Sequence, residues 1–455
     1  MMARAGIKRL YVANRGEIAV RIIRACQKLG IGTVIGVSTA DRESLAGTLA
    51  DRAICIGPPA ASASYLNMEA VVTAARETDC DAVHPGYGFL AENARFQRLC
   101  VQHELRFVGP SAGAIESLGD KVRARRIASE LGVPIVAGED DVESADTAMA
   151  FGRHAGYPFL FKASAGGGGR GMRLVRAPHE VVDAFESATA EARASFGNPQ
   201  IYIERYVERA RHVEIQLIAD DHGNVVHLGE RDCSIQRRHQ KLIEESPSPV
   251  ISDSLRSRMA DSAIRLARHV GYTNAGTVEF LVDLDSKEYF FLEVNTRIQV
   301  EHPVTEMVTG VDLVAEQIRV ANGMPLSISQ EDVTVAGHAI ECRINAEQVE
   351  KGFLPSPGTI KQWQPPTADG IRVDTHCYSG YVIPPFYDSL MAKLIVHGRD
   401  RRAAIATMKE ALGQFLVAGV HTTIPFHQHV LDHADFMEGN ATTRWVENTL
   451  LANAT

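Results

Sequence analysis

The first forty residues alternate between short apolar runs and a longer segment with a helical repeat of apolar positions. A strand-like run at 8–14 leads through Arg15-Gly16 into an amphipathic pattern at 17–30, and a second strand-like run follows at 32–38. This order predicts a parallel βαβ unit. Because the turn lacks the spacing G-x-G-x-x-G, it does not favour a nicotinamide-dinucleotide site.

The remaining pattern divides the chain into four units. Helix and strand signals continue to about residue 106, so we expect residues 1–106 to form an open α/β domain. Residues 107–133 are polar with helical spacing and predict a helical linker. In 134–206, two strand-like segments flank a glycine-rich loop, which suggests a small lid. From 207 to 455, several strand-like runs with short turns predict a larger antiparallel sheet with helices, so the fold class is α/β combined with α+β.

Length and charge restrict the function further. A chain of 455 residues is too long for one core, which agrees with several domains. The formal net charge of −9 argues against nucleic acid as the main partner, because such proteins usually need a basic face. No apolar run approaches the roughly 20 residues that span a bilayer, and the N-terminus does not resemble a signal peptide. We expect a cytoplasmic protein without membrane contact, with its scattered cysteines reduced.

A glycine-rich segment at 162–173 (KASAGGGGRGMR) is the sharpest local signal. Glycines let backbone N–H groups close over a polyphosphate, and Lys162 adds a positive charge. The segment does not continue into the Gly-Lys-Ser/Thr and helix of a P-loop. A plain surface linker is the alternative, but the flanking strands and the lysine favour a phosphate-binding lid.

Two acidic residues lie on neighbouring strand-like runs. Glu279 belongs to GTVEFLVD and Glu293 to FFLEVN, and Asn295 falls on the same strand face as Glu293. If the two runs pair as a hairpin, two carboxylates and an amide converge, which suits magnesium that bridges nucleotide phosphates. Taken alone, two acids that face solvent on an amphipathic hairpin would be the favoured interpretation, but beside the glycine-rich segment a metal site is favoured.

Two polar segments carry further candidates. Arg297, Gln299 and Glu301 alternate in TRIQVEHPVTE, so in an extended loop they share one side and bring a cation, an amide and a possible base together. In ERDCSIQRRHQK, His239 and Lys241 are spaced to share a strand face among cations that would repel one another without anions between them. Surface salt bridges and a solvated charged loop are the alternatives.

Eight segments together resemble the ATP-grasp superfamily and, more narrowly, the biotin carboxylase family. In chain order, from residue 13 to 358, they are ANRGEIAVRIIRA, HPGYGFLAEN, GDKVRAR, KASAGGGGRGMR, ERDCSIQRRHQK, EVNTRIQVEHPVTE, ECRINAE and FLPSPG. One such motif would be weak evidence, whereas eight in order are highly specific. The resemblance implies an ATP-grasp fold, with a glycine-loop lid closing on a larger catalytic domain.

The resemblance also implies a role for individual residues. The implied ATP-binding residues are Lys121, Lys162, Gly168, Gly169, Glu204, Arg205, Tyr206, Val207, His212, Gln236, His239, Glu279 and Glu293. The implied Mg²⁺ or Mn²⁺ ligands are Glu279, Glu293 and Asn295. The implied bicarbonate site consists of Lys241, Arg297, Gln299, the Val300 backbone and Glu301. Tyr87 and Arg343 are implied to face biotin, and the implied catalytic residues are Lys241, Arg297, Glu301 and Arg343.

The activity implied by the resemblance is ATP-dependent carboxylation of biotin through carboxyphosphate, with bicarbonate as the carbon source. Three alternatives are less well supported, because the sequence has one lid and one acid pair, contains both motifs named below and lacks none of the metal acids or the base. A carbamoyl-phosphate synthetase would carry a second lid and acid pair, and another ATP-grasp ligase need not contain HPGYGF or RIQVEHPVTE. A nucleotide-binding regulatory protein without turnover would be expected to lack a metal acid or the base.

The partners follow from what the chain lacks. A biotin carrier needs a biotin-accepting lysine in a Met-Lys-Met turn, whereas Met408-Lys409 lies in a helical pattern. We therefore expect the biotin carboxyl carrier protein and the carboxyltransferase on separate chains, and, from the family, a homodimer. The final acceptor stays open: acetyl-CoA is usual for a chain of this size, with propionyl-CoA and pyruvate as alternatives.

Overall fold

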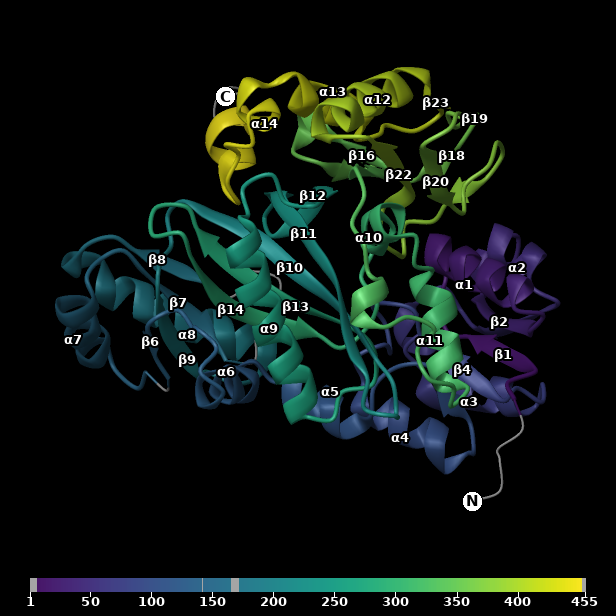
Figure 1. Cartoon of the computed structure of the whole chain (residues 1–455), viewed down its shortest axis with the longest axis horizontal. Helices are drawn as coiled ribbons and strands as arrows, with labels where there is room; N and C mark the ends of the chain where they lie inside the picture. The colour runs from purple at the N-terminus through teal and green to yellow at the C-terminus, as the bar shows by residue number, and fades with distance from the viewer. Residues whose placement is uncertain (1–5, 141, 165–171, 452–455) are drawn as a thin grey trace.

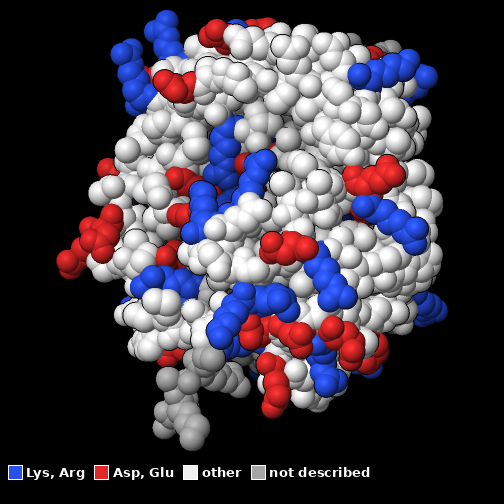
Figure 2. All heavy atoms as spheres, turned by 90° about the vertical axis from the view of Figure 1, so that its right-hand side faces the viewer, with Lys and Arg blue, Asp and Glu red and all other residues white. Residues whose placement is uncertain are grey.

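The computed structural model describes residues 6–140, 142–164 and 172–451. Figure 1 shows the N-terminal sheet on the right, a small sheet on the left, a large twisted sheet between them and the C-terminal helices above it. No helix of the described residues is long and apolar enough to cross a membrane. On the face turned to the viewer in Figure 2, Lys and Arg are interspersed with Asp and Glu.

The N-terminal sheet is parallel throughout, as the βαβ pattern predicts. In spatial order its strands are β3 (Arg52–Gly57), β2 (Gly32–Ser38), β1 (Arg9–Val12), β4 (Ala82–His84) and β5 (Arg106–Phe107). Its helices are α1 (Gly16–Lys28), α2 (Leu45–Leu49), α3 (Met68–Arg76) and α4 (Ala94–Gln102). Gly16 begins α1 with a φ of 67°, which explains why glycine follows Arg15 at this turn.

Two helices and a four-stranded sheet follow. The expected helical linker consists of α5 (Ala112–Gly119) and α6 (Lys121–Glu130), and the Asp120 side chain caps α6 through the Arg123 N–H at 2.7 Å. The small sheet has the order β6 (Gly138–Glu139), β9 (Ile201–Arg205), β7 (Phe159–Ala163) and β8 (Arg173–Val175). Helices α7 (Ala145–Ala155) and α8 (Val181–Phe196) pack beside it. The antiparallel β7–β8 pair confirms the two predicted strands around the glycine loop, whose residues 165–171 lie outside the described residues.

The large sheet is antiparallel, as expected. In spatial order its eight strands are β14 (Glu288–Asn295), β13 (Asn274–Asp283), β10 (Ala210–Ala219), β11 (Val225–Arg237), β12 (Gln240–Ser246), β15 (His338–Asn345), β22 (Leu390–Gly398) and β20 (Ile371–Thr375). The remaining short strands pair as β16 (Glu347–Gln348) with β17 (Leu354–Pro355), β18 (Gly358–Thr359) with β21 (Val382–Ile383) and β19 (Gln362–Gln364) with β23 (Leu416–Ala418).

The two faces of the large sheet differ. The helix face packs against α9 (Asp253–His269) and α12 (Arg401–Gln414) and includes apolar side chains such as Val213 and Cys342. The opposite face, here called the site face, carries charged side chains on the alternate positions, among them Glu214, Arg231, Glu279, Glu341 and Arg343. Helices α10 (His302–Thr309), α11 (Leu313–Ala321), α13 (Ile424–Asp432) and α14 (Ala434–Met437) complete the fold.

Candidate active site

The predicted hairpin of acidic residues forms. Strands β13 and β14 pair in antiparallel register with Glu279 opposite Glu293, joined by a turn after Asp283. Asn295 Nδ2 donates to Glu279 Oε1 at 2.9 Å. The structure therefore brings together the three residues that were singled out as metal ligands.

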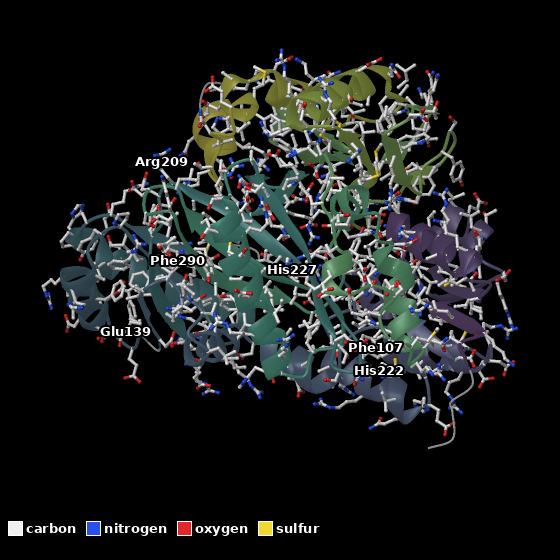
Figure 3. The ribbon with its side chains drawn as sticks, viewed as in Figure 1. Phe107, Glu139, Arg209, His222, His227 and Phe290 are labelled. Carbon is white, nitrogen blue, oxygen red and sulfur yellow. The ribbon has the colours of Figure 1, made fainter. Side chains whose placement is uncertain are left out.

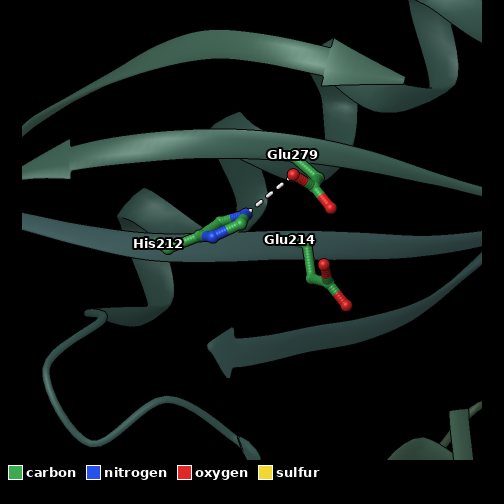
Figure 4. A group of neighbouring side chains, drawn as sticks. All are labelled: His212, Glu214 and Glu279. Carbon is green, nitrogen blue, oxygen red and sulfur yellow. Dashed lines mark hydrogen bonds and ion pairs between the residues drawn. The ribbon is translucent and has the colours of Figure 1, made fainter. Parts of the chain in front are cut away.

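Several polar side chains contact the Glu279 carboxylate. His212 Nε2 lies 2.9 Å from Glu279 Oε2, and Lys241 Nζ lies 2.9 Å from Glu279 Oε1. Burial alone would raise the pKa of Glu279, but Lys241 and His212 outweigh it and hold the pKa well below its usual range. Figure 4 shows Glu214 on the same strand as His212, next to the strand of Glu279. Ligand atoms of His212, Glu214 and Glu279 lie within 4.8 Å of one another.

Lys241 joins three carboxylates. Its Nζ donates to Glu214 at 2.6 Å and to Glu301 at 2.5 Å, besides Glu279. Burial would lower the pKa of Lys241, yet the surrounding anions raise it, so the ammonium stays charged. Arg231, which is fully buried, donates to Glu214 at 2.5 Å and balances the excess negative charge. The sequence analysis did not identify Glu214 or Arg231.

Glu301 lies between two cations. It precedes α10 and is fully buried, with Lys241 on one carboxylate oxygen and Arg343 Nη2 on the other at 2.9 Å. Burial would raise the pKa of Glu301, but Lys241 and Arg343 lower it, so the group is a carboxylate at neutral pH. Arg343 also donates to Glu244 at 2.6 Å.

Arg297 is held by a different set of partners. Its guanidinium donates to Gln299 Oε1 at 2.8 Å, to Asn295 Oδ1 at 3.0 Å and to Glu92 Oε2 at 2.8 Å. The predicted shared side is thus confirmed for Arg297 and Gln299. Glu301 is instead bound by Lys241 and Arg343. Glu92 is a further residue that the sequence analysis missed.

The two lysines among the implied ATP-binding residues each pair with a carboxylate. Lys121, at the start of α6, lies 2.7 Å from Glu293, and Lys162 on β7 pairs with Glu204 on β9. Burial would lower the pKa of Lys121, but Glu293 raises it. Glu204 also accepts from Arg125. In these pairs, Glu293 and Glu204 neutralise the lysine charges that would contact the phosphates of a bound nucleotide.

Four of the implied ATP-binding residues, Glu204 to Val207, lie where the small sheet meets the large one. Val207 belongs to an apolar cluster with Val136 and Ala210, against which Leu281 and Phe290 pack. Figure 3 labels Phe290 on the side of the small sheet, and the Arg205 guanidinium lies 5.7 Å from its ring centroid. The hydroxyl of Tyr206 accepts from Arg444 at 3.2 Å.

One local prediction is wrong. His239 does not share a strand face with Lys241, because β11 ends at Arg237 and Arg238 and His239 form a turn with φ values of 49° and 66°. Gln236, by contrast, is buried on β11 opposite Lys241. Gly168 and Gly169 lie outside the described residues.

Tyr87 and Val300 are linked through Glu17 and Lys393, two residues that the sequence analysis missed. The Tyr87 hydroxyl donates to Glu17 on α1, and Glu17 pairs with Lys393 on β22 at 3.1 Å. Lys393 Nζ donates to the Val300 carbonyl at 2.8 Å. Burial raises the pKa of the Tyr87 phenol well above its usual value, with Glu17 adding to the effect, so the hydroxyl keeps its proton.

The donor chemistry fits a divalent cation. Glu279, Glu293 and Asn295 offer only hard oxygen ligands on paired strands, the set that magnesium prefers. The cations now on both carboxylates, Lys241 and Lys121, show that this position attracts positive charge.

Known proteins resemble the chain along its whole length. Three family descriptions match in order: "Biotin carboxylase, N-terminal domain" at residues 6–115, "Carbamoyl-phosphate synthase L chain, ATP binding domain" at 120–329 and "Biotin carboxylase C-terminal domain" at 341–448. Biotin carboxylase 1 of Bacillus subtilis is 55% identical over 97% of this chain and 98% of its own. A pyruvate carboxylase subunit from Methanothermobacter thermautotrophicus is 50% identical over 96% of this chain and 89% of its own.

Solved structures agree. The biotin carboxylase from Campylobacter jejuni, in a complex described as β-γ-ATP, superposes with a TM-score of 0.94 at 45% identity, covering 97% of this chain and 98% of that one. The biotin carboxylase domain dimer of Hydrogenobacter thermophilus 2-oxoglutarate carboxylase, with MgADP, ADP and bicarbonate, gives a TM-score of 0.92 at 46% identity, covering 98% of each chain.

The fold and the clustered carboxylates and lysines define an ATP-dependent ligase of the ATP-grasp class. Within that class, the chain belongs to the biotin carboxylase family. Its activity is the ATP-dependent carboxylation of biotin, the first half-reaction of a biotin-dependent carboxylase.

Proposed function

We propose that the site face performs both chemical steps of biotin carboxylation with bicarbonate as substrate. The observation that carries the proposal is the position of Glu301, with Lys241 on one oxygen and Arg343 on the other. One carboxylate thereby touches the residue proposed to hold bicarbonate and the residue proposed to face biotin. The structure with ADP, magnesium and bicarbonate belongs to a relative that matches this chain over almost its full length.

The nucleotide binds between the small sheet and the site face. Lys121 and Lys162 release Glu293 and Glu204 and take the ATP phosphates, while Val207 and the backbone of 204–206 line the adenine pocket. Completing the ATP site are His212, Gln236, His239 and the lid glycines Gly168 and Gly169. Glu279, Glu293 and Asn295 would hold Mg²⁺ or Mn²⁺, which supplies charge neutralisation of the phosphates during transfer.

Bicarbonate takes the place among Lys241, Arg297, Gln299, the Val300 backbone and Glu301. The Glu301 carboxylate removes the bicarbonate proton, and a bicarbonate oxygen attacks the γ-phosphorus of ATP, which gives carboxyphosphate and ADP. The lowered pKa of Glu301 makes this proton transfer uphill. Stabilisation of the developing dianion by Lys241 and Arg297, and its immediate phosphorylation, offset that cost.

Biotin is carboxylated in the second step. Carboxyphosphate breaks into carbon dioxide and phosphate, phosphate takes the proton from biotin N1, and N1 attacks carbon dioxide. Arg343 stabilises the ureido oxygen as negative charge develops there, and Tyr87 lies on the same side of the site. This charge appears only during reaction, so stabilising it accelerates the step.

The chain works on a biotin carrier and with a carboxyltransferase that are separate chains, in the cytoplasm and as a homodimer. Supporting this, Met408 is fully buried and Lys409 pairs with Asp432 on an ordinary helix surface. The 2-oxoglutarate carboxylase relative is described as a dimer. The acceptor is a small acyl-CoA or 2-oxo acid, since relatives near 50% identity include part of a pyruvate carboxylase. We also propose that the chain is divided into four domains, residues 1–106, 107–133, 134–206 and 207–455.

The test is a coupled measurement on the purified chain with ATP, magnesium, ¹⁴C-bicarbonate and free biotin. We expect ADP release that depends on bicarbonate and acid-labile ¹⁴C on biotin. Bicarbonate-dependent ADP release without labelled biotin would support another ATP-grasp ligase, and ATP binding without turnover would support a regulatory protein.

A further inference from the structure

Lys393 is a fully buried lysine on β22 that lies outside the residues assigned above. In register it stands beside Arg343 on β15, so the two side chains share the site face. A buried ammonium is costly unless it is bonded on several sides. The partners of the Lys393 ammonium therefore indicate why the fold buries this side chain.

The first bond fixes the main chain that carries Glu301. Lys393 Nζ donates at 2.8 Å to the Val300 carbonyl, which belongs to the peptide unit that joins Val300 to Glu301. Glu301 has a φ of −80° and a ψ of 11°, between the preceding loop and α10. Fixing this peptide sets the direction in which the Glu301 side chain leaves the backbone.

The second bond reaches the residue proposed to face biotin. Lys393 Nζ lies 3.1 Å from Glu17 Oε1, and the same oxygen accepts the hydroxyl of Tyr87. Glu17 is buried on α1, and its other oxygen has no hydrogen-bond partner among the described residues. Among the described residues, one Glu17 oxygen has partners, and Lys393 and Tyr87 share it.

Asp374, one of the other titratable side chains near Lys393, is bonded elsewhere. Asp374 Oδ2 lies 3.9 Å from Lys393 Nζ, but Arg372 Nη2 donates to the same oxygen at 2.7 Å. Among the described residues, the two short contacts of the Lys393 ammonium are therefore the Val300 carbonyl and Glu17.

We propose that Lys393 is a positioning residue that ties the peptide of Glu301 to the Tyr87 hydroxyl through Glu17. It keeps the bicarbonate side and the biotin side of the site in a fixed relation. The inference rests on the proposed function, because it takes the roles of Glu301 and Tyr87 from there. Small displacements of reacting groups are expensive, and an error of about 1 Å can cost about 100-fold in rate.

The test compares Lys393→Met with wild type in two assays, bicarbonate-dependent ADP release and carboxylation of free biotin. We expect kcat to fall about 100-fold in both, with the KM for ATP near the wild-type value. Tyr87→Phe should lose about tenfold in kcat/KM for biotin, as expected for one hydrogen bond, and less in ADP release. Glu17→Gln should reduce both activities, by less than Lys393→Met.

A matched control is Arg401→Met, which removes another cation of low exposure whose bonds go to Glu245 and to the Phe436 and Met437 carbonyls. It should lower the melting temperature without the two-assay loss in kcat. Equal kinetic losses in Arg401→Met, or a folded Lys393→Met with wild-type kcat in both assays, would overturn the proposal. If Lys393→Met does not fold, Glu17→Gln decides: no loss in either assay contradicts the role. Inactive wild-type protein would instead count against the proposed function.

Discussion

Where β12 pairs with β15, buried carboxylates on the two faces of the eight-stranded sheet differ in how fully they are bonded. On the helix face, both oxygens of Glu245 are bonded, to His338 at 2.8 Å and to Arg401 at 2.6 and 3.1 Å. On the site face, neither oxygen of Glu341 has a hydrogen-bond partner among the described residues, and Glu244 has one such oxygen. Carboxylates with too few partners gather where a protein performs chemistry.

Neighbours on β12 show the difference within one strand. Burial raises the pKa of Glu244 to about 7, since Arg343 compensates only part of that cost and Glu301 adds to it. Burial acts in the same direction on Glu245, but the bonds from its helix-face partners outweigh it and lower the pKa to about 2. Glu245 on the helix face is therefore stabilised as a carboxylate by its partners, whereas burial disfavours the charged form of Glu244 on the site face.

Removing the base should have the largest effect. In Glu301→Gln, we expect bicarbonate-dependent ADP release at saturating ATP to fall by about 10²- to 10⁴-fold, because general-base catalysis typically contributes that much. ATP binding should persist, since Glu301 contacts Lys241 and Arg343 rather than the residues of the nucleotide pocket. Near-normal turnover of the variant at saturating bicarbonate would show that Glu301 only orients the substrate.

The metal pair tests the nucleotide side of the site face. Glu293→Gln removes a charge that now holds Lys121 at 2.7 Å, and we expect a loss of ATP turnover of about 100-fold at ordinary magnesium concentration. Glu288→Gln on the same strand is the matched control, because Glu288 pairs with Arg258 at 2.7 Å on a half-exposed surface. Normal ATPase activity of Glu293→Gln with intact folding would remove Glu293 from the metal site.

The contrast on β12 predicts stability changes of opposite sign. Glu245 has a folded-state pKa lowered to about 2 from 4.5, so its stabilisation is present above pH 4.5 and is lost as the pH falls towards 2. At pH 7.5, Glu245→Gln should lower the free energy of unfolding by about 3 kcal/mol. The difference from wild type should shrink below pH 4.5.

Glu244→Gln is the partner measurement. The pKa of Glu244 is raised from 4.5 to about 7, so ionisation opposes folding above pH 4.5 and most strongly above pH 7. We therefore expect this variant to keep or gain stability at pH 7.5 in denaturant titrations. Equal destabilisation by the two substitutions would mean that the faces do not differ.

The smallest effect is expected at Lys409. It is half-exposed on α12 and pairs with Asp432, so Lys409→Arg should leave carboxylation of free biotin unchanged. Mass spectrometry after co-expression with a biotin ligase should find no biotin on the chain. Biotin attached to Lys409 would mean that carrier and carboxylase are not separate.

The parts of the site that could be predicted from sequence are those set by local pattern. Two alternating runs joined by a short turn placed Glu279 opposite Glu293, and the motif spacing placed Arg297 beside Gln299. Glu214 also had a local signal, because it alternates with the apolar positions of HVEIQLIA, but nothing in one strand reveals which neighbours it meets.

Other contacts depend on tertiary structure alone. Lys393 lies 93 positions from the carbonyl it binds, at Val300, and no repeat in the sequence connects them. The His239 prediction failed for a local reason: two residues with positive φ interrupt the strand, although Arg-His carries none of the glycine or asparagine that usually signals such a turn. The sequence therefore did not determine the register across the large sheet. It also did not reveal a turn that lacks glycine or asparagine.

The central claim is that one site face serves both ATP cleavage and biotin carboxylation. Its most direct test is to compare the rates of these two reactions in Arg343→Ala. Arg343 binds Glu301 but is proposed to act on biotin, where charge develops only after ATP has been cleaved. We predict that carboxylation of biotin falls by at least tenfold more than bicarbonate-dependent ADP release, which corresponds to about 1.4 kcal/mol of selective transition-state stabilisation. Equal losses in the two rates would contradict the account.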